Sequence, residues 1–478
     1  MSETTLVPTI GLEVHVQLKT ESKMFCACST RFGARPNDQV CPVCLGLPGT
    51  LPVINERAVR MGVAVGLALG CKVAQRSRFH RKNYWYPDLP KNYQISQYDE
   101  PLAVEGQLTL GEGRVIRVRR VHLEEDPGKL LHPEGTTDHS SVDYNRSGIP
   151  LLEVVSEPDI RSSEEAYLYL STLKLILQYL EVSDCNMEEG NLRCDVNVSV
   201  SPAGEEGSGT LVELKNINSF KAVQRALSYE TKRQIRLVSE GERVIRETRL
   251  WDDDANASRS MRSKEEAHDY RYFIEPDLAP LVVPDSWMEK ILSSLPELPL
   301  ERKQRFVDDY GLSEKDAEVL TSEKALADFF EEVASKDGRA KESNNWVRGP
   351  LLSELHARGQ SIRECPVGPE ELVELLSLVK EETVSQNTGK EVLGKMFETG
   401  KGAAEIVEKE GLSQISSADE LTETVLAVIQ EQSKAVGDYK EGKKAALGFL
   451  MGQVMRRTQG AANPNVVREV LVQLLEGN

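Results

Sequence analysis

Two strand-like segments carry acidic, imidazole and basic side chains at alternate positions. In residues 10–18 apolar and polar side chains alternate, so a strand would bury one face and place Glu13 beside His15 on the other. Residues 192–200 repeat this alternation, and their polar face presents Arg193, Asp195, Asn197 and Ser199. Carboxylates and an imidazole gathered on one face suit Mg²⁺ with a phosphate ligand, because Mg²⁺ prefers hard oxygen donors.

Three further segments add charged groups to such a face. Residues 151–157 place Glu153 and Glu157 on one side of a strand. Residues 115–125 end in two acids, and residues 211–218 add an acid and a base, namely Glu124, Glu125, Glu213 and Lys215. Several such strands predict a concave sheet whose open face is a polar site. The alternative is an ordinary antiparallel sheet with one face in water, and the alternation alone leaves both interpretations open.

Four cysteines stand in two close pairs with the spacing C-x-C-x12-C-x2-C, namely Cys26, Cys28, Cys41 and Cys44. Two pairs separated by a short loop suit a tetrahedral Zn²⁺ site, since each pair supplies two thiolates from one turn. The alternative is four reduced thiols without a metal. A closed four-cysteine site leaves no open coordination position, so its expected role is to hold the loop together.

Basic charge is concentrated in two stretches of an acidic chain. The 478 residues contain 58 Lys and Arg against 76 Asp and Glu, a net charge of −18, which excludes nucleic-acid binding through the overall field. Residues 76–94 nevertheless carry a net +4 and are interleaved with aromatic side chains, and residues 439–478 carry +3. Such local patches suit selective contact with phosphates, although a solvated surface would also explain them.

The elements that must position these residues change in character along the chain. Short alternating segments mixed with helices predict an α+β domain over residues 1–293. Amphipathic helices follow over residues 294–406, after a cluster of prolines, and a second helical block occupies residues 407–478. The predicted architecture is an α+β domain with a largely antiparallel sheet and flanking helices, followed by two α-helical domains.

Several function classes are excluded or disfavoured by missing patterns. No motif of an activated serine or cysteine nucleophile is present, and residues 389–396 resemble a P-loop but place Met396 where Ser or Thr would hold Mg²⁺. The most apolar stretch, residues 61–69, is far shorter than the roughly 20 residues of a membrane helix. The N-terminus lacks the basic region of a secretion signal, so we expect a cytoplasmic protein with no membrane partner.

The motifs of the chain resemble one family from end to end. The segments 10–18, 81–84, 124–126, 150–159, 187–190, 192–195, 213–216, 448–453 and 462–464 occur in the order in which the B subunit of the glutamyl-tRNA(Gln)/aspartyl-tRNA(Asn) amidotransferases (the GatB family) carries them. This resemblance implies an N-terminal cradle-like, kinase-like catalytic domain. It also implies ATP-dependent activation of Glu or Asp mischarged on tRNA as an acyl phosphate, followed by amidation with ammonia.

The resemblance implies further components of such a complex. A separate amidase, the A subunit, would release the ammonia from glutamine, and a small protein, the C subunit, would hold the two larger chains together. The substrates would be Glu-tRNA(Gln), Asp-tRNA(Asn) or both, a choice that the sequence leaves open. ATP and Mg²⁺ would be needed for activation, and Zn²⁺ would be structural.

The resemblance also implies roles for individual residues. The catalytic set is Glu13, His15, Glu124, Glu125 and Glu153. We expect His15, Glu125 and Glu153 to bind Mg²⁺, although adjacent strand residues point to opposite faces, so the choice between Glu124 and Glu125 stays open. The expected phosphate or ATP contacts are Arg81, Lys82 and Arg193, and the residues lining the carboxylate and ammonia path are Asp195 and Lys215. The expected tRNA contacts are Lys443, Lys444, Arg456 and Arg457.

A protein without catalysis is the alternative. A zinc-stapled module that only binds tRNA would explain the cysteine cluster and the basic patches equally well. It would have no need for acids and an imidazole gathered on one face of the sheet. The geometry of that face therefore distinguishes the two hypotheses.

Overall fold

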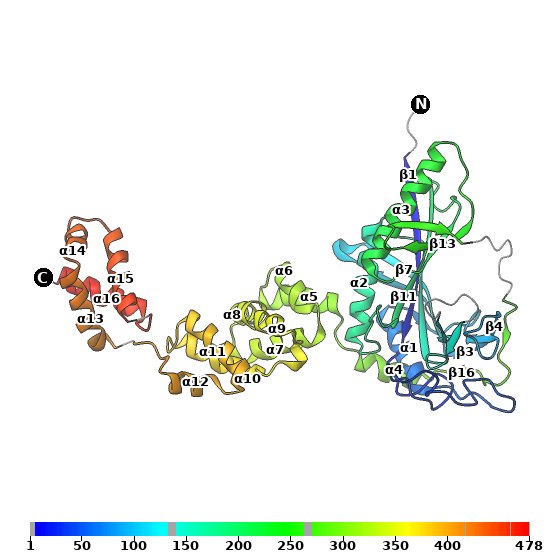
Figure 1. The fold of residues 1–478 in the computed structure, drawn as a ribbon, viewed down its shortest axis with the longest axis horizontal. Coiled ribbons are helices and arrows are strands. Elements are labelled where there is room, and N and C mark those ends of the chain that lie inside the picture. The colour runs from blue at the N-terminus through cyan, green and yellow to red at the C-terminus, as the bar shows by residue number, and fades with distance from the viewer. Residues whose placement is uncertain (1–4, 132–139, 262–269, 416, 459, 478) are drawn as a thin grey trace. The chain divides into compact units, whose positions relative to one another are not determined.

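The computed structural model describes residues 5–131, 140–261, 270–415, 417–458 and 460–477. The chain forms two compact units, residues Met1–Leu298 and Pro299–Asn478, and each is described by itself (Figure 1). The first unit is α+β and the second is helical, as predicted. No helix among the described residues has both the length and the apolar character needed to cross a membrane.

One large sheet dominates the first unit. Within the described residues it has nine strands in the order β14-β13-β12-β11-β1-β10-β7-β6-β2, and every neighbouring pair is antiparallel except β12 and β13. Its strands are β1 (Leu6–Gln17), β2 (Lys72–Val73), β6 (Ala103–Thr109), β7 (Val115–Glu125), β10 (Pro150–Ser156), β11 (Leu192–Pro202), β12 (Val212–Lys215), β13 (Glu247–Asp252) and β14 (Ala257–Ser260). The sheet is therefore largely antiparallel, as expected.

Small sheets and helices complete the first unit. The small sheets pair β4 (His80–Asn83) with β5 (Tyr93–Ser96) and β15 (Phe273–Ile274), β3 (Arg76–Ser77) with β16 (Leu281–Val282), and β8 (Lys129–Leu131) with β9 (Ser141–Asp143). The helices are α1 (Glu56–Ala68), α2 (Ser163–Tyr179), α3 (Phe220–Ser239) and α4 (Asp285–Ser294), with the short η1 (Gly111–Gly113). The β4–β5–β15 sheet matters most for the site, because it carries the basic stretch of residues 76–94.

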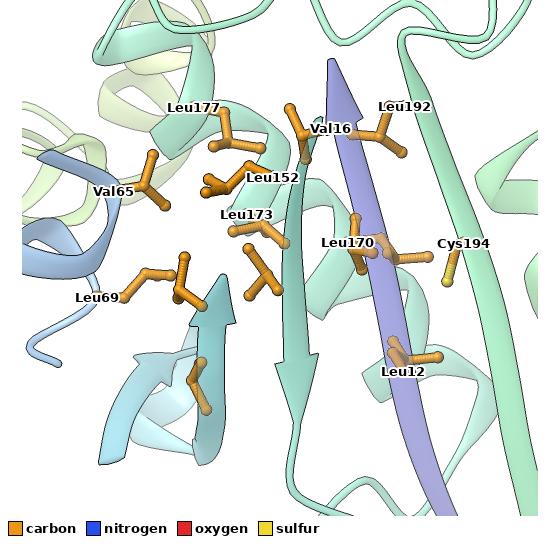
Figure 2. Close-up of a cluster of buried hydrophobic side chains, with 14 of the residues drawn as sticks. Leu12, Val16, Val65, Leu69, Leu152, Leu170, Leu173, Leu177, Leu192 and Cys194 are labelled. Atoms are coloured by element: carbon orange, nitrogen blue, oxygen red, sulfur yellow. The ribbon is translucent and has the colours of Figure 1, made fainter. Parts of the chain in front are cut away.

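The core lies between one face of the large sheet and the helices α1 and α2. Leu12 and Val16 of β1, like Ile10 and Val14, are fully buried because the alternation places them on one face. Figure 2 shows their side chains beside those of Leu152, Leu173 and neighbouring helix residues. Burial of the apolar face fixes the register of β1 against its neighbours, since a one-residue slip would turn this set toward solvent.

Close packing of α1 depends on a glycine. A Cβ atom at Gly62 would lie 2.7 Å from a methyl carbon of Leu102 and 3.3 Å from methyl carbons of Leu123 and Leu152. A larger residue would therefore push the helix away from the sheet. Helix α2 is capped by Ser162, the residue before it, whose side-chain oxygen accepts a hydrogen bond from the backbone N–H of Glu165 at 3.0 Å.

The second unit contains two separate hydrophobic cores. The first is formed by α5 (Pro299–Tyr310), α6 (Glu314–Thr321), α7 (Lys324–Asp337), α8 (Ala340–Trp346), the π-helical η2 (Val347–Leu351), α9 (Leu352–Arg358), η3 (Ile362–Glu364), α10 (Pro369–Lys380), α11 (Gln386–Thr399) and α12 (Ala403–Glu410). The second is formed by α13 (Ala418–Glu431), α14 (Ser433–Lys440), α15 (Ala445–Arg457) and α16 (Pro464–Glu476).

The predicted domain boundaries fall inside helices of the structure. The boundary after residue 293 lies within α4, whose Ile291 packs in the core of the first unit. The boundary after residue 406 lies within α12, because Ile406 and Val407 are buried in the same core. Amphipathic periodicity identifies such helices but does not say which core their apolar face joins, so the division into three domains stays a prediction.

Candidate active site

Antiparallel pairing brings the polar residues of four neighbouring strands into one row. His15 of β1 is opposite Glu153 of β10 on one side and opposite Arg193 of β11 on the other. Glu153 is in turn opposite His122 of β7. Side chains of paired residues point to the same face of a sheet, so the row crosses the polar face that the alternation predicts.

Two imidazoles and two carboxylates of this face lie close together. His15 Nδ1 lies 3.3 Å from Glu124 Oε1 and 3.9 Å from Glu153 Oε2. His122 Nε2 lies 3.0 Å from the same Glu153 oxygen, and Glu124 accepts a hydrogen bond from the Ser96 hydroxyl at 3.1 Å. One ligand atom from each of His15, Glu124 and Glu153 lies within 4.8 Å of the others, which suits a single divalent cation. We call these three residues the acid–imidazole cluster.

The opposite charges of the imidazoles and carboxylates around the cluster stabilise one another. Burial opposes ionisation of both imidazoles, but Glu153 and Glu124 overcome it and raise the pKa of His122 to about 9. Burial also opposes ionisation of Glu153, yet the His122 charge lowers the pKa of Glu153 to about 2. The pKa of Glu13, two residues from His15, is raised by burial and by the nearby charges of Glu153 and Asp195. The cluster thus keeps its carboxylates ionised, as metal ligands must be.

Glu125 lies apart from the cluster, so the structure does not assemble the expected set of His15, Glu125 and Glu153. Its carboxylate pairs with the buried ammonium of Lys91 and accepts a hydrogen bond from the backbone N–H of Ile95 at 2.9 Å. Glu124 takes its place beside His15, because adjacent residues of β7 point to opposite sides. Glu125 and Lys91 instead line a cavity of about 210 Å³ that also reaches Cys26 and Cys44.

The two neighbouring cations of β4, Arg81 and Lys82, also have different surroundings. Arg81 makes a two-pronged ion pair with the buried carboxylate of Glu275, at 2.7 and 2.8 Å, and reaches Asp277 at 3.1 Å. Its guanidinium is therefore committed to protein carboxylates. Lys82 lies within electrostatic reach of the acid–imidazole cluster: burial lowers its pKa, but the charge of Glu124 offsets this and leaves the pKa of Lys82 above its usual value. Of the two cations of β4 that were expected to contact phosphate, only Lys82 lies near the cluster.

Arg193 is held on the other side of His15 by a buried acid. Its guanidinium donates to Asp126 Oδ1 at 2.7 Å, and Gln17 donates to the second oxygen of Asp126 at 2.5 Å. The Asp126 side chain is fully buried, whereas that of Arg193 is about one-third exposed. Arg193 is thus fixed in place and still accessible from the polar face.

A second charged group extends the polar face onto β12. Lys215 Nζ contacts Asp195 Oδ2 at 2.9 Å and Glu213 Oε1 at 3.0 Å. Glu13 is opposite Asp195 in the register and accepts a hydrogen bond from Asn197 at 3.0 Å. The predicted Asp195 and Lys215 therefore lie together, on β11 and β12, the first and second strands beyond β1.

The four cysteines converge as their spacing predicts. Their sulfur atoms lie within 4.8 Å of one another, and a tetrahedral zinc site with bonds of about 2.3 Å needs sulfurs roughly 3.8 Å apart. The backbone N–H of Cys41 donates to the Cys44 sulfur at 3.1 Å. The ammonium of Lys23, which is 1% exposed, lies 3.7 Å from the same sulfur. This donor set and the buried cation fit a metal held by thiolates.

The expected tRNA contacts lie at both ends of α15. Lys443 and Lys444 precede the helix, and Arg456 and Arg457 form its last turn. Lys443 is paired with Asp438 at 2.7 Å, and Arg457 with Glu431 at 2.7 Å. The structure thus brings these cations together in pairs at opposite helix ends.

Sequence reasoning missed three residues of this site. His122 could have been found, because it precedes Glu124 by two positions on a strand and so shares its face. Asp126 and Lys91 carried no such signal. Asp126 lies just beyond β7, and Lys91 meets Glu125 through a contact that spans 34 residues.

Known proteins match the chain over nearly its whole length. A family model described as the GatB/GatE catalytic domain matches residues 8–289, and one described as the GatB domain matches residues 328–475. The B subunit of the aspartyl/glutamyl-tRNA(Asn/Gln) amidotransferase of Thermodesulfovibrio yellowstonii is 53% identical over 471 residues, 98% of each chain. The protein of the same name from Caldanaerobacter subterraneus is 55% identical over 465 residues, 97% of this chain and 98% of that protein. The chain therefore belongs to the GatB family of amidotransferase B subunits.

Proposed function

We propose that this chain amidates Glu mischarged on tRNA(Gln), Asp mischarged on tRNA(Asn), or both, in an ATP-dependent reaction. The observation that carries the proposal is the acid–imidazole cluster on the polar face of the large sheet, with Lys82 on one side and Arg193 on the other. The names of the relatives support the substrate class. Because aminoacyl-tRNA is used by ribosomes, we place the reaction in the cytoplasm.

The reaction would proceed in two balanced steps. A side-chain carboxylate oxygen of the esterified Glu or Asp attacks the γ-phosphorus of ATP, and the bond to ADP breaks. Ammonia then attacks the carbonyl carbon of the acyl phosphate, inorganic phosphate leaves with that oxygen, and a proton is released. The product is Gln-tRNA or Asn-tRNA.

The residues around the cluster have distinct tasks in this scheme. His15, Glu124 and Glu153 would hold Mg²⁺, which when bound neutralises charge on the transferring phosphoryl group. Lys82 and Arg193 would bind phosphate oxygens as fixed cations, and Asp126 keeps Arg193 in position. Asp195 and Lys215 would line the route of the carboxylate and of ammonia.

Partner chains and a second metal belong to the same proposal. The sequence carries no motif of an activated serine or cysteine nucleophile for glutamine hydrolysis, so a separate glutaminase, the A subunit, would supply the ammonia, and the small C subunit would complete the complex. The metal of the four-cysteine site would be Zn²⁺, since four thiolates in a tetrahedral arrangement suit zinc. The cations around α15 would contact the tRNA backbone.

A module that only binds tRNA is less well supported. Such a module would not require two buried carboxylates, Glu124 and Glu153, with one ligand atom each within 4.8 Å of the other and of a His15 nitrogen, because burying two acids together is costly without a bound cation or a reaction to serve.

An amidation assay of the assembled complex tests the proposal. We expect Gln-tRNA(Gln) or Asn-tRNA(Asn) to form from the mischarged tRNA when ATP, Mg²⁺ and glutamine are present, and not when ATP is omitted. Correctly charged Glu-tRNA(Glu) serves as the control substrate. Digestion of the tRNA and chromatography of the released amino acids give the yield. Failure to form amide on either mischarged tRNA would reject the proposed function.

A further inference from the structure

Four tyrosine rings form a continuous row beside the acid–imidazole cluster. The ring centres of Tyr84 and Tyr270 are 5.9 Å apart, as are those of Tyr270 and Tyr272. Tyr272 is stacked on Tyr98 with a centre distance of 4.1 Å and an interplanar angle of 7°. The rings come from the ends of β4 and β5 and from the chain just before β15, so tertiary structure assembles a row that no sequence pattern encodes.

The inner end of the row meets the site, and the outer end is open. The ammonium of Lys82 lies 4.8 Å from the centre of the Tyr270 ring, and the same ammonium interacts with the charge of Glu124. At the other end Tyr98 is 49% exposed although Tyr272 covers one face of its ring. The structure thus holds a flat aromatic surface ready to receive another planar group.

A cation accompanies this outer end. Arg120 of β7 lies two residues from His122 and four from Glu124, on the same face, so the three span roughly 13 Å of strand. Its Nη1 donates to the backbone oxygen of Tyr98 at 3.5 Å, and its buried Nε has no hydrogen-bond partner. Among the described residues, no carboxylate forms an ion pair with Arg120, unlike Arg117 and Arg119 of the same strand.

An exposed aromatic stack beside an uncompensated guanidinium suits a nucleotide, since a base stacks on the ring and a phosphate pairs with the cation. Two sources of an adenine nucleotide meet at this site, ATP and the terminal adenosine that carries the amino acid. A free nucleotide is usually enclosed by its pocket, whereas the open Tyr98 ring suits a base whose polymer is held elsewhere too.

We propose that Tyr98, stacked on Tyr272 and flanked by Arg120, binds the single-stranded 3′ end of the RNA substrate by stacking on its terminal base. This inference rests on the proposed function and adds the subsite that delivers the esterified amino acid to the acid–imidazole cluster. The span of about 13 Å between Arg120 and Glu124 is of the order that a ribose, an ester and an amino-acid side chain bridge.

The test compares Tyr98→Leu with Tyr98→Phe in the assembled complex. Tyr98→Leu removes the stacking ring, and we expect it to raise KM for mischarged tRNA about five-fold or more while leaving kcat and KM for ATP within about two-fold. Tyr98→Phe keeps the ring and should restore KM. Melting curves of both variants show whether the leucine substitution disturbs the fold.

A binding measurement supports the kinetic one, and its wild-type and Arg120→Gln arms stay informative even if Tyr98→Leu does not fold. Fluorescence anisotropy with a labelled acceptor-stem hairpin should show tighter binding of the hairpin ending in CCA than of one ending in CC, and Tyr98→Leu should abolish that difference. Arg120→Gln should reduce the slope of log Kd against log salt by about 0.7, the value for one lost contact to a single strand.

The outcomes separate this inference from the proposed function. A wild-type complex that forms no amide rejects the proposed function, whatever the hairpins show. An active complex in which Tyr98→Leu raises KM for ATP instead of tRNA, or weakens both hairpins equally, overturns the inference alone. An unchanged salt slope in Arg120→Gln would remove the guanidinium from the subsite.

Discussion

The Glu124→Gln variant is expected to form amide about 10³-fold more slowly than the wild-type complex while hydrolysing glutamine at the normal rate. Glutamine keeps the shape of the side chain and can still accept the Ser96 hydrogen bond, but it removes the charge that faces His15. Removal of one group that stabilises transition-state charge typically costs about 10²–10³-fold, and Glu124 is also a proposed metal ligand. Amide formation and glutaminase activity are measured on the same preparation.

Two other glutamates give this prediction its controls. Glu157→Gln alters a half-exposed ion pair with Arg119, just beyond the end of β10, and amide formation should stay near wild type. Glu125→Gln affects the pair with Lys91 on the other side of β7. Binding of Mn²⁺ as a spectroscopic substitute for Mg²⁺, followed by electron paramagnetic resonance, should therefore weaken in Glu124→Gln and not in Glu125→Gln. The reverse order would return Glu125 to the metal site.

Replacing Cys41 and Cys44 together with serine is expected to remove the metal and unfold the loop that contains it. A structural zinc site contributes an apparent binding free energy of about 10–16 kcal/mol, which is folding free energy for a segment that cannot fold alone. Residues 21–50 have only four buried side chains, those of Lys23, Met24, Phe25 and Cys44. Hydrogen exchange of this loop should therefore become fast in the variant while the large sheet stays protected.

A cysteine outside the cluster provides the matched control. Cys365 lies in the second unit and is half-buried, and its thiol contacts only the backbone oxygen of Val367 among the hydrogen bonds of the described residues. Cys365→Ser should retain the metal in elemental analysis and the wild-type exchange pattern. If the double variant loses the metal but the loop stays protected, the site does not hold the loop together.

The parts of the fold that the sequence predicted are those with local periodicity. The alternation in β1 and β11 places one set of residues in the core, and the structure confirms it because burial of that face fixes the register. The cysteine spacing was equally informative, since each pair of ligands comes from one turn. The domain boundaries were harder to predict, because tertiary packing decides which core Ile406 and Val407 join.

The parts of the site that the sequence could not predict depend on distant contacts. The local sequence does not show which of Arg81 and Lys82 is available to bind phosphate. In the structure Glu275, which is 194 residues away, pairs with Arg81, and Lys82 stays near the cluster. Glu124 and Glu125 are likewise adjacent, and Lys91 decides between them by pairing with Glu125. In both cases one buried ion pair determines which neighbour is left for chemistry.

The central claim is that this chain transfers a phosphoryl group to the side-chain carboxylate of the esterified amino acid. The most direct measurement uses mischarged tRNA whose side-chain carboxylate is labelled with ¹⁸O, followed by mass spectrometry of the products. The scheme predicts that one labelled oxygen appears in inorganic phosphate for every amide formed. Label in AMP, or amide formation with no label in phosphate, would contradict activation as an acyl phosphate.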